Sequence, residues 1–209
     1  MATRMQTTIK SGKGTADGAV SEMACFFGVK PGHEEQVRAA CQRFAAAVRG
    51  ADPQATQKTG LRDSRHVLFD GGRRLLWATT FETDWDPYLD DALIIMGPDH
   101  FIDWMQHTIE AEDLGQWFLQ SGGREALGRT GTPEQEQAAR ATSAGLKAIL
   151  QSVQVPAAGY FNALADRSIP EIRHALGTQH AFEQVLDHPD AAQALQQPAL
   201  RPLLERAAD

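Results

Sequence analysis

Two runs of strand-forming residues with a glycine turn between them give the clearest pattern in the chain. Residues 61–69 and 74–81 alternate side chains of different character, and the turn DGGR occupies positions 70–73. Paired glycines tolerate the positive φ angles of a tight hairpin turn. A two-residue turn at the glycines sets the register and places His66 opposite Trp77. The pattern therefore predicts an antiparallel hairpin at the centre of the fold.

The two faces of this hairpin differ, because successive side chains of a strand point to opposite sides. One face mixes polar, basic and aromatic groups, which suits the wall of a partly polar cavity. It comprises Arg62, Ser64, His66, Leu68, Leu75, Trp77, Thr79 and Phe81. The other face is mostly aliphatic near the turn, so we expect helices to cover it. It comprises Arg65, Val67, Phe69, Leu76, Ala78 and Thr80.

The other elements follow from hydrophobic periodicity and from helix and turn signals. We expect strands at 23–29 and 158–164, and helices at 33–48, from Asp86 to Met96, from about Asp99 onward, at about 132–153 and from Ser168 to about Asp187. Asp86 is the expected N-cap of the second helix. In the next helix Ile109 is expected to face the core, with Trp104 flanking the apolar stripe.

The order of these elements is that of an α+β protein with a ferredoxin-like β-α-β-β-α-β antiparallel sheet. Residues 1–22 are polar and predict a flexible tail, and residues 23–209 predict one barrel-like domain. Extra helices form an insert at about 97–155 and a C-terminal extension. One sheet face would remain bare, and either a second copy of the chain or the extra helices are expected to cover it.

Composition excludes some partners. The 209-residue chain has a formal net charge of −7, with 42% apolar and 22% charged residues. Nucleic-acid binding needs a basic face, so we expect no nucleic-acid partner. No segment approaches the roughly 20 apolar residues of a membrane span. The N-terminus lacks an apolar signal core, so we expect a cytoplasmic protein without a membrane partner. Cys25 and Cys41 are expected to be buried, reduced thiols.

The mixed hairpin face contains the best candidate site. An imidazole at His66, beside the guanidinium of Arg62, the hydroxyl of Ser64 and the indole of Trp77, could orient an anionic aromatic substrate. Histidine could also move a proton near neutral pH. A hydrogen-bonded histidine near a sheet edge explains the pattern equally well. Walls of such a site would come from Trp77, Thr79, Phe81 and Tyr160.

Two other histidine patterns could bind metal or haem. His100, Asp103 and His107 share one side of a predicted helix and could offer donors to a divalent metal. A solvated polar face is the simpler explanation. His180 is a candidate axial ligand for haem, although an exposed or structural role is the simpler explanation there too. No phosphate-binding loop, nucleophile elbow or HExxH motif occurs in the sequence.

Residues 23–44 (MACFFGVKPGHEEQVRAACQRF) and 65–85 (RHVLFDGGRRLLWATTFETDW) resemble the first strand and helix and the central hairpin of the dimeric α+β barrel superfamily. That superfamily includes cofactor-free monooxygenases acting on aromatic polyketides, haem-degrading enzymes, haem peroxidases and proteins without known catalysis. The dye-decolourising haem peroxidases carry a GxxDG motif, which this sequence lacks. The resemblance implies a homodimer.

These observations together predict an oxidoreductase of monooxygenase-like type that binds a small apolar or aromatic molecule. His66, Arg62 and Ser64 would be its catalytic groups, and the cofactor would be absent or haem. A non-catalytic ligand-binding or dimerisation module is one alternative. A haem-binding, peroxidase-like protein is another.

Overall fold

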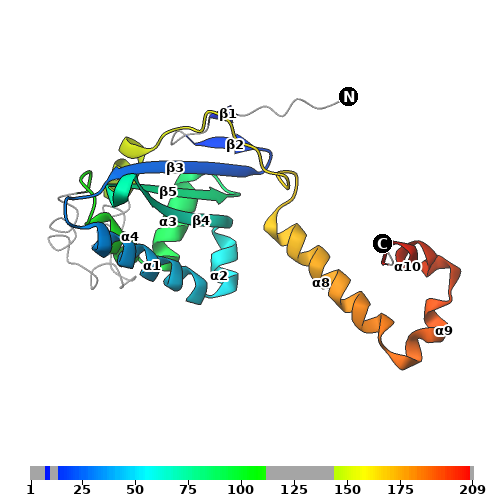
Figure 1. Cartoon of the computed structure of the whole chain (residues 1–209). Helices are drawn as coiled ribbons and strands as arrows, with labels where there is room; N and C mark the ends of the chain where they lie inside the picture. The colour runs from blue at the N-terminus through cyan, green and yellow to red at the C-terminus, as the bar shows by residue number, and fades with distance from the viewer. Residues whose placement is uncertain (1–7, 10–13, 112–143, 208–209) are drawn as a thin grey trace, which may run out of the picture. The chain divides into compact units, whose positions relative to one another are not determined.

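The computed structural model describes residues 8–9, 14–111 and 144–207 (Figure 1). The chain divides into two compact units, Met1–Asp166 and Arg167–Asp209, rather than forming the expected single domain from residue 23 onward. Residues 112–143, which include most of the predicted insert and the start of its helix, lie outside the described residues. No helix in the described part of the chain is both long enough and apolar enough to cross a membrane.

The first unit is an α+β structure built on a five-stranded antiparallel sheet, which confirms the predicted class. The strands are β1 (Thr8–Ile9), β2 (Thr15–Asp17), β3 (Val20–Gly28), β4 (Leu61–Phe69) and β5 (Arg74–Phe81), in the spatial order β1-β2-β3-β5-β4. Because β3 and β4 both run antiparallel to β5, they run parallel to each other. The helix α1 joins them, so β5 fills the middle of a split β-α-β unit.

Helices cover one face of this sheet (Figure 1). They are α1 (Glu34–Gly50), the short α2 (Pro53–Lys58), α3 (Trp85–Met96) and α4 (Pro98–Met105). A further helix over residues 144–153 adds Leu146 and Leu150 to the same core. The predicted apolar stripe of α1 is buried at Val37, Ala40, Cys41 and Phe44. Each helix thus uses its apolar side to close one core against the sheet.

Three details of the predicted helices are wrong. The N-cap of α3 lies two residues earlier than expected: the helix begins at Trp85, and Asp84 rather than Asp86 stands at the N-cap. The indole of Trp104 is completely buried instead of flanking the core. Ile109 is 53% exposed, because α4 ends at Met105 and the chain has left helical geometry before it reaches that residue.

The predicted strand over residues 158–164 does not form. The free edge of β3 is taken instead by β2, which pairs with it from Val20 to Glu22. Beyond β2, the described residues supply single contacts rather than a strand: Gln154 bridges to Cys25, and the amides of Val155 and Ile109 donate to the carbonyls of Ala24 and Gly28. Pro156 follows, and a proline has no N–H with which to continue a ladder.

The predicted flexible tail over residues 1–22 is too long. Residues 15–17 form β2, and Val20 to Glu22 are the first residues of β3. Thr15, Asp17 and Val20 are buried. The hydrophobic pattern did not indicate these strands, because their sequence is polar. Their buried polar groups are paired with each other instead: the Thr15 hydroxyl donates to the Glu22 carboxylate.

The second unit is helical, with α8 (Ile169–Leu186), α9 (Ala192–Leu195), α10 (Arg201–Ala207) and short 3₁₀ turns between them. The predicted start of α8 at Ser168 is confirmed, and a capping box of Ser168 and Glu171 with both reciprocal bonds begins the helix. The helix α8 buries none of its residues. A unit of this size has too little chain to bury a long helix on its own.

Candidate functional site

The predicted pairing of the hairpin is confirmed, although its turn is longer than expected. His66 pairs with Trp77, and Ser64 pairs with Thr79. The last pair is Phe69 with Arg74, so the loop has four residues, 70–73, rather than two. Three consecutive residues from Asp70 onward have positive φ angles, 53°, 65° and 87°. The two glycines adopt such angles without strain, so the sequence signal for the turn was sound.

The two faces of the hairpin have the opposite environments from those predicted. The face with His66 and Trp77 lies under the helices, where the His66 ring meets Phe44 of α1 and Trp104 of α4 at centroid distances of 5.2 and 4.9 Å. The aliphatic face is the open one, and Val67 is 42% exposed there. The aromatic side chains explain which face the helices cover, because burying an indole removes more apolar area from water than burying Val or Ala.

The groups expected to line a ligand cavity instead form core contacts. The Trp77 indole N–H donates to Ser64 Oγ at 3.0 Å. The Thr79 hydroxyl donates to the Asp63 carbonyl at 2.9 Å and therefore accepts from the Tyr88 hydroxyl at 2.8 Å. Burial raises the pKa of Tyr88 above its usual range. Phe81 stacks on Tyr88 with ring centroids 4.1 Å apart.

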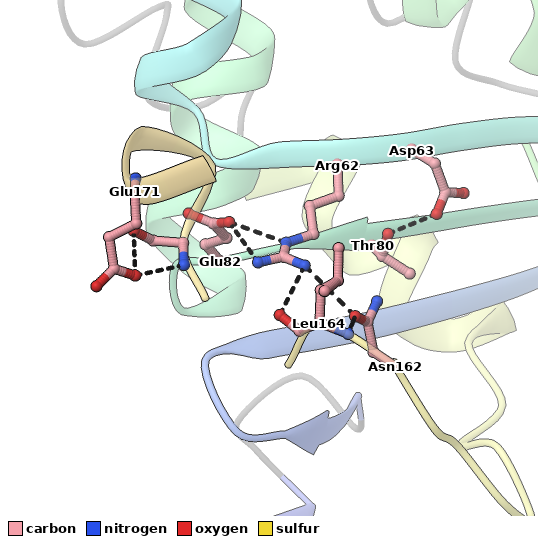
Figure 2. Close-up of polar contacts among 8 residues, drawn as sticks. Arg62, Asp63, Thr80, Glu82, Asn162, Leu164 and Glu171 are labelled. Atoms are coloured by element: carbon pink, nitrogen blue, oxygen red, sulfur yellow. Dashed lines mark hydrogen bonds and ion pairs between the residues drawn. The ribbon is translucent and has the colours of Figure 1, made fainter. Parts of the chain in front are cut away.

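Arg62 does not join His66, because the strand register shifts at this point. Leu61 pairs with Phe81 and Asp63 with Thr80, so Arg62 is the extra residue of a bulge. Its guanidinium contacts Glu82 at 2.8 and 2.9 Å (Figure 2). It also donates to the backbone carbonyl of Leu164 at 3.2 Å. Figure 2 shows this arginine between the sheet edge and the segment that contains Leu164, where it acts as a clamp.

His66 is held neutral by its surroundings. Burial lowers its pKa to about 4. Its Nε2 atom is buried and has no hydrogen-bond partner among the described residues. The ring also stacks nearly parallel to the Trp77 indole, with an interplanar angle of 12°. The expected trio of His66, Arg62 and Ser64 is thus not assembled: Arg62 contacts Glu82, and Ser64 contacts Trp77.

A groove of about 600 Å³ lies between α1 and β4, the last strand in the order of the sheet. Its lining includes His66 and the apolar side chains Phe44, Val48, Leu61 and Leu68. Charged groups at its lips are Arg38, Arg49, Arg62, Arg65 and Asp63. The groove is therefore the concave feature to which His66 belongs, and it lies on the helix side of the edge strand.

Cys41 also lines this groove. Burial raises the pKa of its thiol to about 12. A thiol of that kind is not a nucleophile at neutral pH. Both cysteines are buried and free, which confirms the predicted reduced thiols.

A second hollow of about 480 Å³ lies on the open face of the sheet. Its floor includes Ala24, Phe26, Leu76 and Ala78, and residues 155–160 form one wall. Tyr160, expected beside Trp77 and Phe81, lines this hollow instead. Burial raises the pKa of its hydroxyl. The sheet thus separates Tyr160 from the other residues of the predicted ligand site.

The predicted metal ligands do not converge. Asp103 accepts two bonds from the Arg43 guanidinium at 2.8 and 2.9 Å. His107 lies beyond the end of α4, and its ring contacts His33. Within the described part of the chain, no three His, Cys, Asp or Glu residues gather as a metal site would require. The haem candidate, His180, is exposed on α8 beside Gln184 and Glu183.

Sequence reasoning missed the contact between His33 and His107. Their Nδ1 atoms are 3.0 Å apart. His33 precedes α1 and His107 follows α4, so 74 positions separate them and no local spacing could have indicated the pair.

Comparison of the chain with family models, curated proteins and solved structures finds no match. The assignment of a function therefore depends on the groove, the open sheet face and the histidines described above.

Proposed function

We propose that the Met1–Asp166 unit is a binding module for a small organic anion with an apolar or aromatic body, held in the groove between α1 and β4. The observation that carries the proposal is the combination of shape and charge in that groove. Its volume of about 600 Å³ falls in the range of roughly 300–1,000 Å³ typical of small-molecule sites.

The charge of the groove favours an anion. Arg62 is paired with Glu82 and Arg65 with Asp63, which leaves Arg38 and Arg49. The lips therefore carry a net charge of about +2 (Arg38 and Arg49), whereas the whole chain carries −7. Arg38 lies 3.6 Å from Glu35, but both side chains are exposed and such ion pairs are weak, so the Arg38 charge can still attract an anion. Positive groups around an apolar cleft concentrate an anionic ligand there.

The geometry supports binding more than the expected oxygenase chemistry. A cofactor-free oxygenase would need His66 to remove a substrate proton. With a pKa of about 4, His66 is a weak base at neutral pH. Arg62 is also held by Glu82 and Leu164 and is not directed at a substrate. We therefore assign His66 to the wall of the groove, where it offers ring surface to the ligand.

The test uses two fluorescent probes with similar aromatic bodies. Anilinonaphthalene sulfonate carries an anionic group, and phenylnaphthylamine is uncharged. We expect the sulfonate to bind the full chain more tightly. Replacing Arg38 and Arg49 together by Gln should weaken sulfonate binding about tenfold, equivalent to roughly 1.4 kcal/mol, and leave the uncharged probe unchanged.

A bulky residue in the groove provides the matched control. Ala45 lines the groove, and Ala46 is its exposed neighbour outside it. Ala45→Trp should block both probes, whereas Ala46→Trp should block neither. Unchanged binding to Ala45→Trp would overturn the groove as the site. Equal weakening of both probes by the arginine changes would overturn the preference for an anion.

A second candidate function concerns the open sheet face. We infer that the first unit is related to the ferredoxin-like core of the dimeric α+β barrel type, with β2 in the place of its last strand, and that a second copy of the chain covers this face. The exposure of Val67, at 42%, on an apolar strand face supports this inference, as does the split β-α-β order of β3, α1 and β4.

Light scattering at several concentrations tests the homodimer. Val67→Arg should convert a dimer to a monomer. Val185→Arg is the control, because Val185 is similarly exposed, at 46%, but lies on α8. A wild-type chain that is monomeric at high concentration would contradict the inference, and so would a Val67→Arg variant that remains dimeric.

A further inference from the structure

Two histidine rings that are distant in sequence bring their Nδ1 atoms close together. The Nδ1 atoms of His33 and His107 are 3.0 Å apart, and the ring planes are tilted by 56°. Both rings are only partly buried, so solvent reaches the pair. Without a metal, one ring must donate its Nδ1–H to the other, because two lone pairs cannot face each other at this distance.

The backbone holds this arrangement in place. The His33 amide donates to the Lys30 carbonyl at 3.0 Å, which closes the turn before α1. The Lys30 amide donates to the His107 carbonyl at 3.0 Å, and Val29 bridges to Thr108. The Lys30 ammonium adds a bond of 2.9 Å to the Gln106 carbonyl. The two rings are therefore carried by segments that are tied to each other directly, which preorganises the pair.

The geometry points to a site for a divalent transition-metal ion, with His33 and His107 as the two protein ligands. Imidazole nitrogens bind zinc at about 2.0–2.1 Å. Two such ligands are about 2.9 Å apart at right angles and about 3.3 Å apart in a tetrahedron. The observed 3.0 Å lies close to the right-angle value. Tetragonal Cu²⁺ and octahedral Ni²⁺ use right angles, and Cu²⁺ binds nitrogen ligands most strongly in the divalent series.

Because no third candidate ligand of the described chain joins the pair, the remaining coordination positions belong to water or to an incoming ligand. This makes an open site, unlike the closed four-ligand sites that hold structural zinc.

The charges around the pair set its affinity. Lys30 and Arg43 both disfavour added positive charge near His107, and Asp103 favours it. Arg43 is bound to Asp103 at 2.8 Å, so these two charges largely cancel. Lys30 is then the main opposing charge. Replacing it by Gln should tighten metal binding, whereas a purely structural histidine pair would give no such response.

The experiment titrates untagged full chain with Cu²⁺ alone and with Ni²⁺ alone, by calorimetry and by electron paramagnetic resonance for copper. We expect one strongest site per chain with two coordinated nitrogens. His33→Ala and His107→Ala should each weaken it at least about tenfold, and Lys30→Gln should tighten it severalfold. His100→Ala is the matched control, since His100 lies on α4 outside the pair. Unchanged binding in either pair variant would overturn the site.

A second measurement needs no variant and so does not depend on the folding of one. Paramagnetic Cu²⁺ broadens the nuclear magnetic resonance signals of the residues nearest to it. At substoichiometric copper, broadening should begin at residues 30–34 and 106–109. Broadening that begins elsewhere, for example at the exposed histidines of α8, would overturn the proposal.

Discussion

The two faces of the β4–β5 hairpin differ in a way that their sequences do not suggest. The face with more polar groups is buried, and the more aliphatic face is open. On the buried face each hydroxyl has a local partner, such as Ser64 with Trp77 and Thr79 with Tyr88. A satisfied hydroxyl costs little to bury. The difference teaches that large aromatic rings, rather than the count of polar residues, determine which face the helices cover.

The largest expected effect comes from truncating one residue on each face and comparing the free energies of unfolding. Trp77→Ala should lower the free energy of unfolding by about 3–5 kcal/mol, because it leaves a cavity among Trp104, Phe101 and His66. Val67→Ala on the open face should change the free energy of unfolding by less than about 0.5 kcal/mol at protein concentrations at which the chain is monomeric. Urea denaturation followed by circular dichroism measures both. Equal losses at the two positions would contradict the assignment of the faces.

Two arginines on β4 allow a buried ion pair to be compared with an exposed one on the same strand. The Arg62 and Glu82 side chains are only 11% and 12% exposed, whereas Arg65 is 64% exposed beside Asp63. Arg62→Met should destabilise the protein by about 3 kcal/mol, because Glu82 would lose its guanidinium partner at a mostly buried position. Arg65→Met should have no measurable effect.

The double variant Arg62→Met, Glu82→Leu checks the cause. It should recover much of the loss, since it removes the stranded charge together with its partner. If the double variant is no more stable than Arg62→Met alone, the clamp on Leu164 matters more than the ion pair.

The smallest expected effect concerns His66 and depends on pH. Its pKa is about 4 in the folded protein, against 6.5 for the ordinary side chain. Between these values the unfolded chain binds a proton that the folded chain does not, so stability is lost as the pH falls from 6.5 to 4. The loss should reach about 2–3 kcal/mol. His66→Phe removes this titration and should be less sensitive to pH over that window, as thermal unfolding at pH 7 and pH 4 would reveal. A stability difference between the two proteins that stays constant over this range would show that His66 does not titrate in this way.

Local signals predicted much of the fold. The glycine turn and the strand pattern gave the pairing of His66 with Trp77, and the apolar stripe gave α1 to within two residues at either end. The capping box at Ser168 placed the start of α8. These features depend on residues that are close together in the sequence and on backbone geometry, so they can be predicted from local patterns alone.

Contacts between distant segments could not be predicted in this way. The β2 strand has a polar sequence, and only the free edge of β3 makes a strand of it. The pairing of Arg62 depends on a bulge and on Leu164, which is 102 positions away. The expected trio of His66, Arg62 and Ser64 failed for that reason, since one inserted residue turned Arg62 toward Glu82.

The sequence by itself determined the hairpin, its register and the helices that accompany it, because strand alternation, turn glycines and helix caps act over a few residues. The tertiary structure alone decided which face of the hairpin is buried, where the groove beside β4 opens and that His33 meets His107. Those outcomes follow from the total apolar area removed from water and from chain segments brought together over long distances, and both are properties of the folded whole.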